Sequence, residues 1–230
     1  MKWKKWFVLS WILIVVISVV YSISVRVSIS TIELSDDNMM DLPVYFEAVD
    51  EEDDRLYFQN KDISMEELYD ASDLVVKVRV LGERKAEYEA ILTKTKVLEV
   101  YKGEESLLNQ DIYVYEYASI DIIDEKFSIL LSRACNLMQE NNEYYLLLDF
   151  LQKPEGYDYD EISGKTYLLN NICYGKFSTK EYATEDLNME LYDGIVYGEI
   201  RNLDVLYDDQ DKTDSYYCKR LDFLTLINKN

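Results

Sequence analysis

The sequence predicts a mainly β fold of the α+β class. An N-terminal transmembrane helix is expected to precede a β-barrel of five to six strands with a short leading helix and a C-terminal helix. Hydrophobic residues make up 48% of the 230-residue chain, which is enough for a packed core. Only 7 Gly and 2 Pro stand beside 21 Tyr, a composition that favours strands joined by short polar turns. Several segments alternate apolar and polar residues, as half-buried strands do.

The N-terminal segment is the first expected element. Residues 6–25 carry no charge, and a helix of that length, at about 1.5 Å per residue, spans the ~30 Å hydrocarbon layer. Three lysines precede the run, so the positive-inside rule leaves the N-terminus in the cytoplasm. Residues 1–28 are therefore predicted to form a cytoplasmic tip and a signal anchor in the cell membrane. The alternative is a cleaved signal peptide, because the small Ser22 and Ser24 could form its cleavage site.

An acidic extracytoplasmic linker is expected over residues 29–62. The acidic run Asp50–Asp54 repels itself and extends the chain, and it lacks the spacing of a calcium loop. Ser64 followed by Glu67 is a capping-box pattern, which predicts a short helix over residues 65–71. This helix begins a folded domain that comprises residues 63–230.

Two long strands follow the helix. In residues 73–81 (DLVVKVRVL) apolar side chains alternate with Lys77 and Arg79, as in a half-buried strand, and residues 82–87 (GERKAE) are the expected turn. In residues 88–101 the apolar positions change parity near Leu98. This change predicts a β-bulge and a bent strand, which closing barrels require.

The remaining elements are shorter. Strands are expected over residues 111–117 and 142–151, the latter nearly all apolar and therefore central, and a fifth with a short sixth over residues 165–177. The intervening residues 119–140 are interpreted as a long connection. A C-terminal helix capped by Asp214 is predicted from helical spacing of four apolar residues: Tyr217, Leu221, Leu224 and Ile227. The predicted barrel interior comprises Leu74, Val76, Val78, Ile112, Val114, Leu146 and Leu148.

Four segments together resemble the netrin/tissue-inhibitor-of-metalloproteinases module, and the bacterial membrane-anchored extracytoplasmic proteins that share its OB-like barrel. They read ASDLVVKVRVLGE, YEAILTKTKVLEVYKG, DIYVYEY and NEYYLLLDF, and a later YGKF matches as well. The matching residues are Ala71, Asp73, Leu74, Val75, Val97, Val100, Lys102, Gly103, 145–150 and 174–177.

This likeness covers about residues 71–177, under half of the chain, and it implies a five-stranded barrel with a flanking helix. Inhibitory activity does not carry over. Such inhibitors place an N-terminal cysteine at the protease zinc, whereas this chain has no cysteine before Cys135.

Charge and composition exclude several classes of function. The chain has no histidine, which excludes Ser-His-Asp hydrolysis, His-based zinc sites and histidine acid–base catalysis. The net charge is −21, and removing the four cations of the first thirty residues leaves −25 on the rest, so nucleic acid is not an expected partner. We expect no enzyme activity and no cofactor.

The predicted function is that of an extracytoplasmic binding module. Its expected partners are the lipid bilayer, through residues 6–25, and a protein or glycan of the cell envelope, for which a cationic partner is the natural electrostatic match. The alternatives are a carboxylate-based hydrolase and a purely structural envelope protein.

Two sets of residues are candidates for a site. Tyr113, Tyr115 and Tyr117 share one face of a strand, and they form either a binding face or a surface packed under the C-terminal helix, of which the sequence favours packing. Three cysteines outside the cytoplasm allow one disulfide, for which Cys135 and Cys173 are the best pair, or three buried thiols.

Two acidic clusters, residues 157–161 and 207–214, are interpreted as solvated loops. Paired carboxylates in such loops could instead do glycosidase chemistry or bind calcium weakly, but nothing in the sequence fixes their separation. No catalytic or metal-binding residue is therefore predicted.

Overall fold

The structure is a computed structural model that describes residues 11, 13–19, 21, 32–47, 62–87, 90–151, 156, 161–180, 192–207 and 210–229. The chain divides into two compact units, residues 1–32 and residues 33–230. Among the described residues, no helix combines the length and the apolar character needed to cross a membrane. Most of the expected anchor, residues 6–25, lies outside the described residues.

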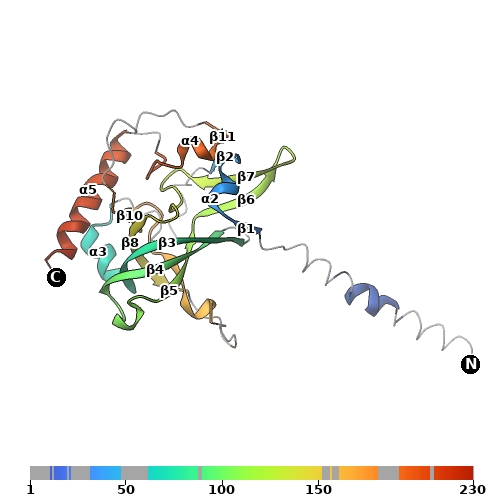
Figure 1. The fold of residues 1–230 in the computed structure, drawn as a ribbon, viewed down its shortest axis with the longest axis horizontal. Coiled ribbons are helices and arrows are strands. Elements are labelled where there is room, and N and C mark those ends of the chain that lie inside the picture. Colours follow the sequence, from blue (N-terminus) through green and yellow to red (C-terminus); the bar gives the residue numbers. More distant parts are fainter. Residues whose placement is uncertain are drawn as a thin grey trace, which may run out of the picture. The chain divides into compact units, whose positions relative to one another are not determined.

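Unit 33–230 is mainly β with helices at its periphery, as predicted, and its strands form two sheets (Figure 1). In the larger sheet five strands hydrogen-bond in a ring, because the fifth of them returns to the first. In ring order they are β3 (Leu74–Glu87), β4 (Ala90–Lys102), β5 (Asp111–Glu116), β9 (Thr166–Leu169) and β8 (Glu143–Phe150), which pairs again with β3. The β5–β9 pairing is parallel and the other four are antiparallel.

Side chains from all five strands meet in one apolar cluster, which we call the ring core. All seven residues predicted for the barrel interior belong to it. The nearly continuous apolar sequence of β8 also has an explanation. Tyr144, Leu146 and Leu148 enter the ring core, whereas Leu147 faces a second cluster on the opposite side. In addition, β8 pairs with β3, β9 and β10 (Lys176–Ser178). The prediction of a central strand at this position is confirmed.

The register of β3 and β4 tests the predicted bend. Lys77 lies opposite Glu99 and Val78 lies opposite Val97, so Leu98 has no partner in the ladder and the predicted bulge is confirmed. The turn predicted at residues 82–87 is wrong, because those residues continue β3 after an irregularity between Val80 and Arg84. Gly82 has φ 81°, a left-handed conformation that glycine adopts without steric cost. In the sequence, a glycine followed by charged residues resembles a turn, which explains the wrong prediction.

The smaller sheet was not expected. Its order is β11 (Ile195–Val196), β2 (Pro43–Glu47), β7 (Lys126–Ser132) and β6 (Ala118–Ile123). The predicted long connection 119–140 therefore contains a hairpin, β6–β7. The linker prediction is wrong for residues 32–47, which form β1 (Ile32–Leu34), α2 (Asp36–Met39) and β2 and bury Met39 and Val44 completely. Residues 48–61 lie outside the described residues.

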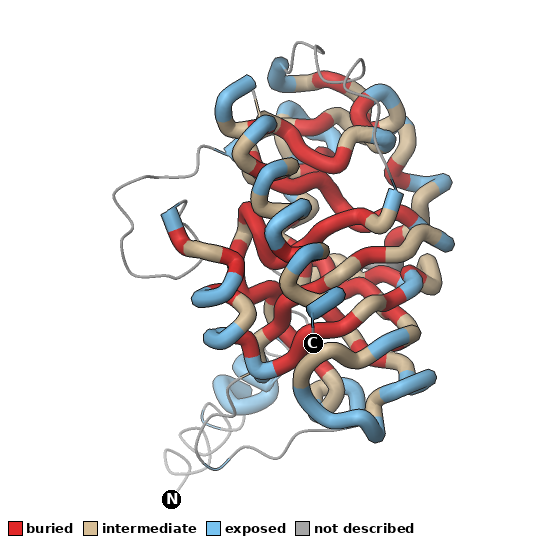
Figure 2. Tube along the Cα trace, turned by 90° about the vertical axis from the view of Figure 1, so that its left-hand side faces the viewer, coloured by how far each residue is buried: buried red, intermediate tan, exposed pale blue. Residues whose placement is uncertain are grey.

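Two helices pack on the outward face of β3, β8 and β10. The capping box of Ser64 and Glu67 begins α3 (Met65–Ala71), as predicted, and α3 contacts α5 (Gln210–Ile227). Tyr216 and Phe223 of α5 enter a second cluster, which we call the helix-side core and which includes Val75, Leu147 and Phe177. In Figure 2 the side that carries α5 faces the viewer, and exposed segments recur along this helix in front of buried strands.

The predicted packing face of α5 is partly wrong. The helix starts four residues before the expected cap Asp214, and Leu221 is 60% exposed, whereas Thr213, Tyr216 and Phe223 are buried. The predicted residues and the buried residues of α5 both recur at helical spacing, so the hydrophobic period alone did not identify which set is buried. The other short helices are α4 (Tyr197–Ile200) and two 3₁₀ turns, η2 (Glu105–Leu107) and η3 (Ser163–Lys165).

Candidate binding groove

The outer face of β4 and β5 carries the candidate site. Along β5 the side chains alternate, so that Ile112 and Val114 are fully buried in the ring core while Tyr113 and Tyr115 are half-buried on the other face. Lys94 of β4 lies directly opposite Tyr113 in the ladder. This alternation turns a row of aromatic and charged side chains outward, beside the chain segment that leads into β9.

Two adjacent hollows lie on this face, with volumes of about 470 and 400 Å³. Both are lined by Tyr113 and Ile162, so we treat them as one feature and call it the outer groove. Each hollow falls within the ~300–1,000 Å³ range of small-molecule sites. The other lining residues are Leu34, Gly82, Glu83, Arg84, Lys85, Leu92, Lys94, Asn109, Gln110, Asp111, Glu161 and Lys165.

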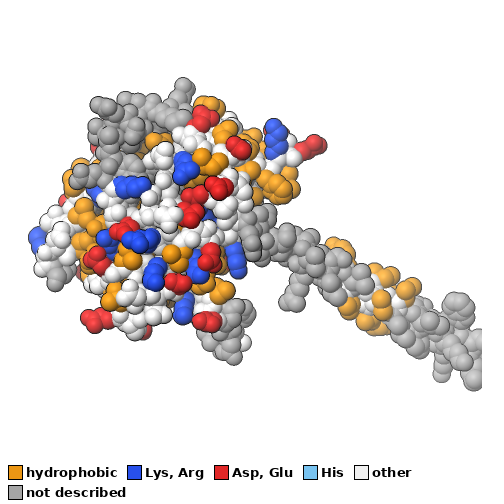
Figure 3. All heavy atoms as spheres, in the orientation of Figure 1, with side chains coloured by type: hydrophobic (Ala, Val, Ile, Leu, Met, Phe, Trp, Pro, Cys, Tyr) orange, Lys and Arg blue, Asp and Glu red, His pale blue; other side chains and the backbone are white. Residues whose placement is uncertain are grey.

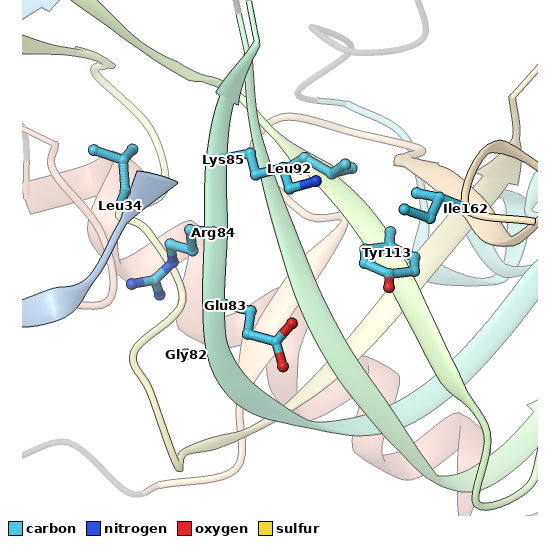
Figure 4. A pocket seen from close by; sticks show the side chains of 8 residues that line it. All are labelled: Leu34, Gly82, Glu83, Arg84, Lys85, Leu92, Tyr113 and Ile162. Carbon is cyan, nitrogen blue, oxygen red and sulfur yellow. The ribbon is translucent and has the colours of Figure 1, made fainter. Parts of the chain in front are cut away.

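The irregularity in β3 shapes one wall of this groove. Three residues, 81–83, lie opposite Lys94 alone, since Val80 pairs with Thr95 and Arg84 pairs with Thr93. Figure 4 shows Glu83 and Lys85 pointing to the side of β3 that carries Tyr113, whereas Arg84 points to the opposite side. The bulge therefore adds charged side chains to the groove wall without removing Arg84 from the interior.

The three tyrosines of the predicted binding face have different environments. The Tyr115 hydroxyl donates to Glu87 at 2.6 Å, and the Tyr117 hydroxyl donates to the Leu169 carbonyl at 3.3 Å. Burial raises the pKa of both phenols. Tyr113 lines the groove, and its hydroxyl has no hydrogen-bond partner within the described part of the chain. Of the three tyrosines, Tyr113 alone is among the groove-lining residues, and none of them belongs to the helix-side core against which α5 packs.

Opposite charges pair along the groove lining. Lys94 Nζ lies 2.9 Å from a Glu83 oxygen and 3.6 Å from an Asp111 oxygen, and Lys165 Nζ lies 3.5 Å from Glu161. The hydrogen bond to Glu83 is the main reason that the pKa of Lys94 is raised. These pairs restrict side chains that would otherwise sample many rotamers, so the groove is partly preorganised.

A buried ionic network connects strands of the larger sheet to α2 and to the segment after β7. Arg84, only 2% exposed, donates to Asp36 of α2 and to the Met138 carbonyl. Burial opposes the charged form, but Glu116 and Asp36 raise the pKa of Arg84 above its usual value. Lys176 Nζ lies 3.1 Å from Glu116, whose other oxygen accepts from Thr93 at 2.6 Å. Buried charges require such pairing, and here it fixes β3, β5 and β10 against the segment after β7.

The predicted cysteine pair is brought together. Cys135 and Cys173 are both buried, and the Cys135 thiol donates to the Cys173 carbonyl at 3.0 Å. The structure holds them as free thiols, and burial raises the pKa of Cys135. The disulfide therefore stays a prediction. Cys218 lies exposed on α5.

Asp73 and Asp149 form a pair of neighbouring carboxylates that lies away from the groove. The Phe150 amide donates to Asp73 at 2.9 Å, and the Asn170 amide donates to the neighbouring Asp149 at 2.8 Å. Burial, and then the charge of Asp73, raise the pKa of Asp149. The first bond joins the start of β3 to the end of β8, and the second joins the residue after β9 to the end of β8. The acidic clusters 157–161 and 207–214 lie partly outside the described residues.

Sequence reasoning found Tyr113 but missed most of the groove. Tyr113 was predictable from its position on the outward face of β5. The same reasoning applies to Lys94, its partner in the β4–β5 ladder. Ile162 and Lys165 had no such signal, because they come from the connection before β9. No protein-family model matches the chain, and no curated protein matches it.

Proposed function

We propose that this chain is a membrane-anchored, extracytoplasmic binding module without catalytic activity, built on an OB-like barrel, with a protein or glycan of the cell envelope as its ligand. The observation that carries the proposal is the position of the outer groove. OB barrels bind ligands on the face of their second and third strands, flanked by the loop between strands four and five. In chain order, β4 and β5 are the second and third of the five ring strands, and Ile162 lies in the connection between the fourth, β8, and the fifth, β9.

The ring of pairings supports the barrel assignment. The order β3-β4-β5-β9-β8 with one parallel pair, β5–β9, is the pattern of a five-stranded Greek-key barrel. The bulge at Leu98 supplies the bend that such a barrel needs. The likeness to the netrin-type module is a further support, carried by the residues quoted above.

The anchor rests on sequence. Residues 6–25 have the length and apolar character of a membrane span behind three lysines, which places the folded unit outside the cytoplasm. In that compartment, a strongly acidic unit that carries an aromatic groove is suited to contact with envelope components.

One experiment tests both the groove and its location. A photo-crosslinking amino acid replaces Gln110 at the groove in the full chain, and a matched variant replaces Glu125 at the tip of the β6–β7 hairpin, outside the groove. Intact cells are illuminated and only then stripped of their wall, after which external protease should release a crosslinked product from the Gln110 variant and not from the Glu125 variant. Full protection from protease would overturn the location, and identical products from both variants would overturn the groove as the site.

A further inference from the structure

We infer that the outer groove binds an uncharged oligosaccharide. This inference rests on the proposed function, because it names the ligand class of the same site. Three properties of the groove support it: local charge balance, an apolar platform with a free hydroxyl, and side-chain amides without partners.

The charge of the groove differs from the charge of the chain. The chain carries −21, yet the groove lining has three lysines, Lys85, Lys94 and Lys165, and three acids, Glu83, Asp111 and Glu161, while Arg84 is bound to Asp36. Over the region of β3, β4 and β5, Figure 3 shows basic and acidic side chains interspersed. A ligand selected by charge would favour an excess of one sign, so this lining favours a neutral ligand.

Part of the groove lining is apolar. The Tyr113 ring lies between the two hollows, and the aliphatic side chains of Ile162 and Leu92 lie on the same side (Figure 4). An aromatic ring flanked by aliphatic carbon suits the C–H face of a pyranose ring, whereas a fully apolar ligand would leave the surrounding charges without solvent. The free hydroxyl of Tyr113 adds one donor and one acceptor at the edge of this platform.

Two amides supply further hydrogen bonds. Asn109 and Gln110 are exposed at the groove, and neither side chain has a hydrogen-bond partner within the described part of the chain. Each primary amide carries donors and an acceptor on one rigid plane, which matches neighbouring sugar hydroxyls. Asn109 holds φ 65°, and its backbone amide donates to the Val97 carbonyl at 3.0 Å, so its position is fixed by the backbone.

The test uses the full chain in detergent micelles, labelled with a fluorophore at the exposed Cys218. The probes are immobilised neutral oligosaccharides (glucans, galactans, mannans and N-acetylglucosamine oligomers), with polyglucosamine and lysine-rich peptides as cationic probes. We expect a neutral glycan to bind with an affinity that does not change between low and moderate salt, because no charge is screened. The Tyr113→Ala change should weaken that binding about tenfold, and Tyr113→Phe about threefold or less.

Control variants distinguish the loss of a ligand contact from the loss of the fold. Tyr192→Ala makes the same chemical change at an exposed tyrosine before β11 and should leave binding unchanged, and thermal melting shows whether each variant is folded. Gln110→Ala removes an exposed groove amide and should weaken binding even if Tyr113→Ala does not fold. Salt-sensitive binding to cationic probes alone would overturn the inference and leave the binding module intact. Failure of the folded protein to bind any probe would overturn the inference and leave a protein as the ligand of the binding module, whereas cleavage of a probe would overturn the proposed function as well.

Discussion

Arg84 of β3 is buried against groups from two segments outside the ring. Its side chain is fully buried and donates to Asp36 and to the Met138 carbonyl, two groups that come from outside the ring strands. A buried guanidinium is tolerated only while these partners are present, because its desolvation is not otherwise compensated. The residue therefore links the folding of residues 32–47 to the folding of the ring.

Replacing Arg84 with Met should destabilise the protein strongly, since it leaves Asp36 without its cation. We expect a loss of about 3–5 kcal/mol in the free energy of unfolding, measured by urea denaturation. The matched control is Arg79→Met, which removes a surface ion pair with Glu143 from a half-exposed side chain and should cost about 0–1 kcal/mol. Equal losses in the two variants would contradict a structural role for the buried network.

Glu143 gives the protein a predictable response to acid. Hydrogen bonds from Arg79, and then from Lys77, lower its pKa in the folded state. A carboxyl whose pKa is depressed by folding contributes stability above its unfolded pKa, about 4.3, and loses it as pH falls through the lower folded value. Melting temperatures measured between pH 7 and pH 3 should therefore fall less steeply for Glu143→Gln than for the parent. A Glu125→Gln control, at an exposed turn, should follow the parent.

At the scale of elements, the turn before β10 depends on one glycine. A Cβ atom added at Gly175 would lie 2.4 Å from the Asn171 carbonyl oxygen and 2.9 Å from its nitrogen. These are backbone atoms of the same tight turn, which the Gly175 amide closes with a 2.9 Å hydrogen bond to Asn171. The YGKF motif thus contains a glycine that packing requires.

Gly175→Ala should therefore destabilise the protein by about 1–3 kcal/mol, the usual cost of overpacking a close contact. Gly164→Ala is the matched control, because nothing lies within 4 Å of its added Cβ and its backbone is not left-handed. We expect the control to change stability by less than about 0.5 kcal/mol. Denaturant titration of both variants checks the difference, and a neutral Gly175→Ala would show that the turn can shift.

The strands and helices differ in how well the local sequence predicted them. Alternation located β3 and β5 and placed Leu98 at a bulge, because the period of a strand reports which side chains face a core. A nearly continuous apolar run located β8. The same signal failed at residues 82–87, where glycine and charged residues resemble a turn although the chain continues as a strand. On α5, two apolar sets share the helical period, and only tertiary contacts select Phe223 over Leu221.

At the scale of the whole molecule, the unpredicted parts are those that depend on distant partners. Neither β2 nor β11 has a strong local pattern, and both owe their strand conformation to the smaller sheet. The groove shows the same limit. Tyr113 could be predicted from its own strand, but Ile162 and Glu83 reach the groove only because the ring and the bulge bring them there.

The parallel pairing of β2 with β7 has a kinetic consequence. Val44 lies opposite Ile129, 85 residues later, and also opposite Ile195, 151 residues later. Pairings of such sequence separation must close long loops before they gain any stabilisation, so chains of high contact order fold on the millisecond-to-second scale. Because a chain is synthesised from its N-terminus, β2 emerges long before either of its partners. During that interval its unpaired edge is open to other strands, and the acidic residues on both sides of it, Asp41 and Asp50–Asp54, keep neighbouring chains apart.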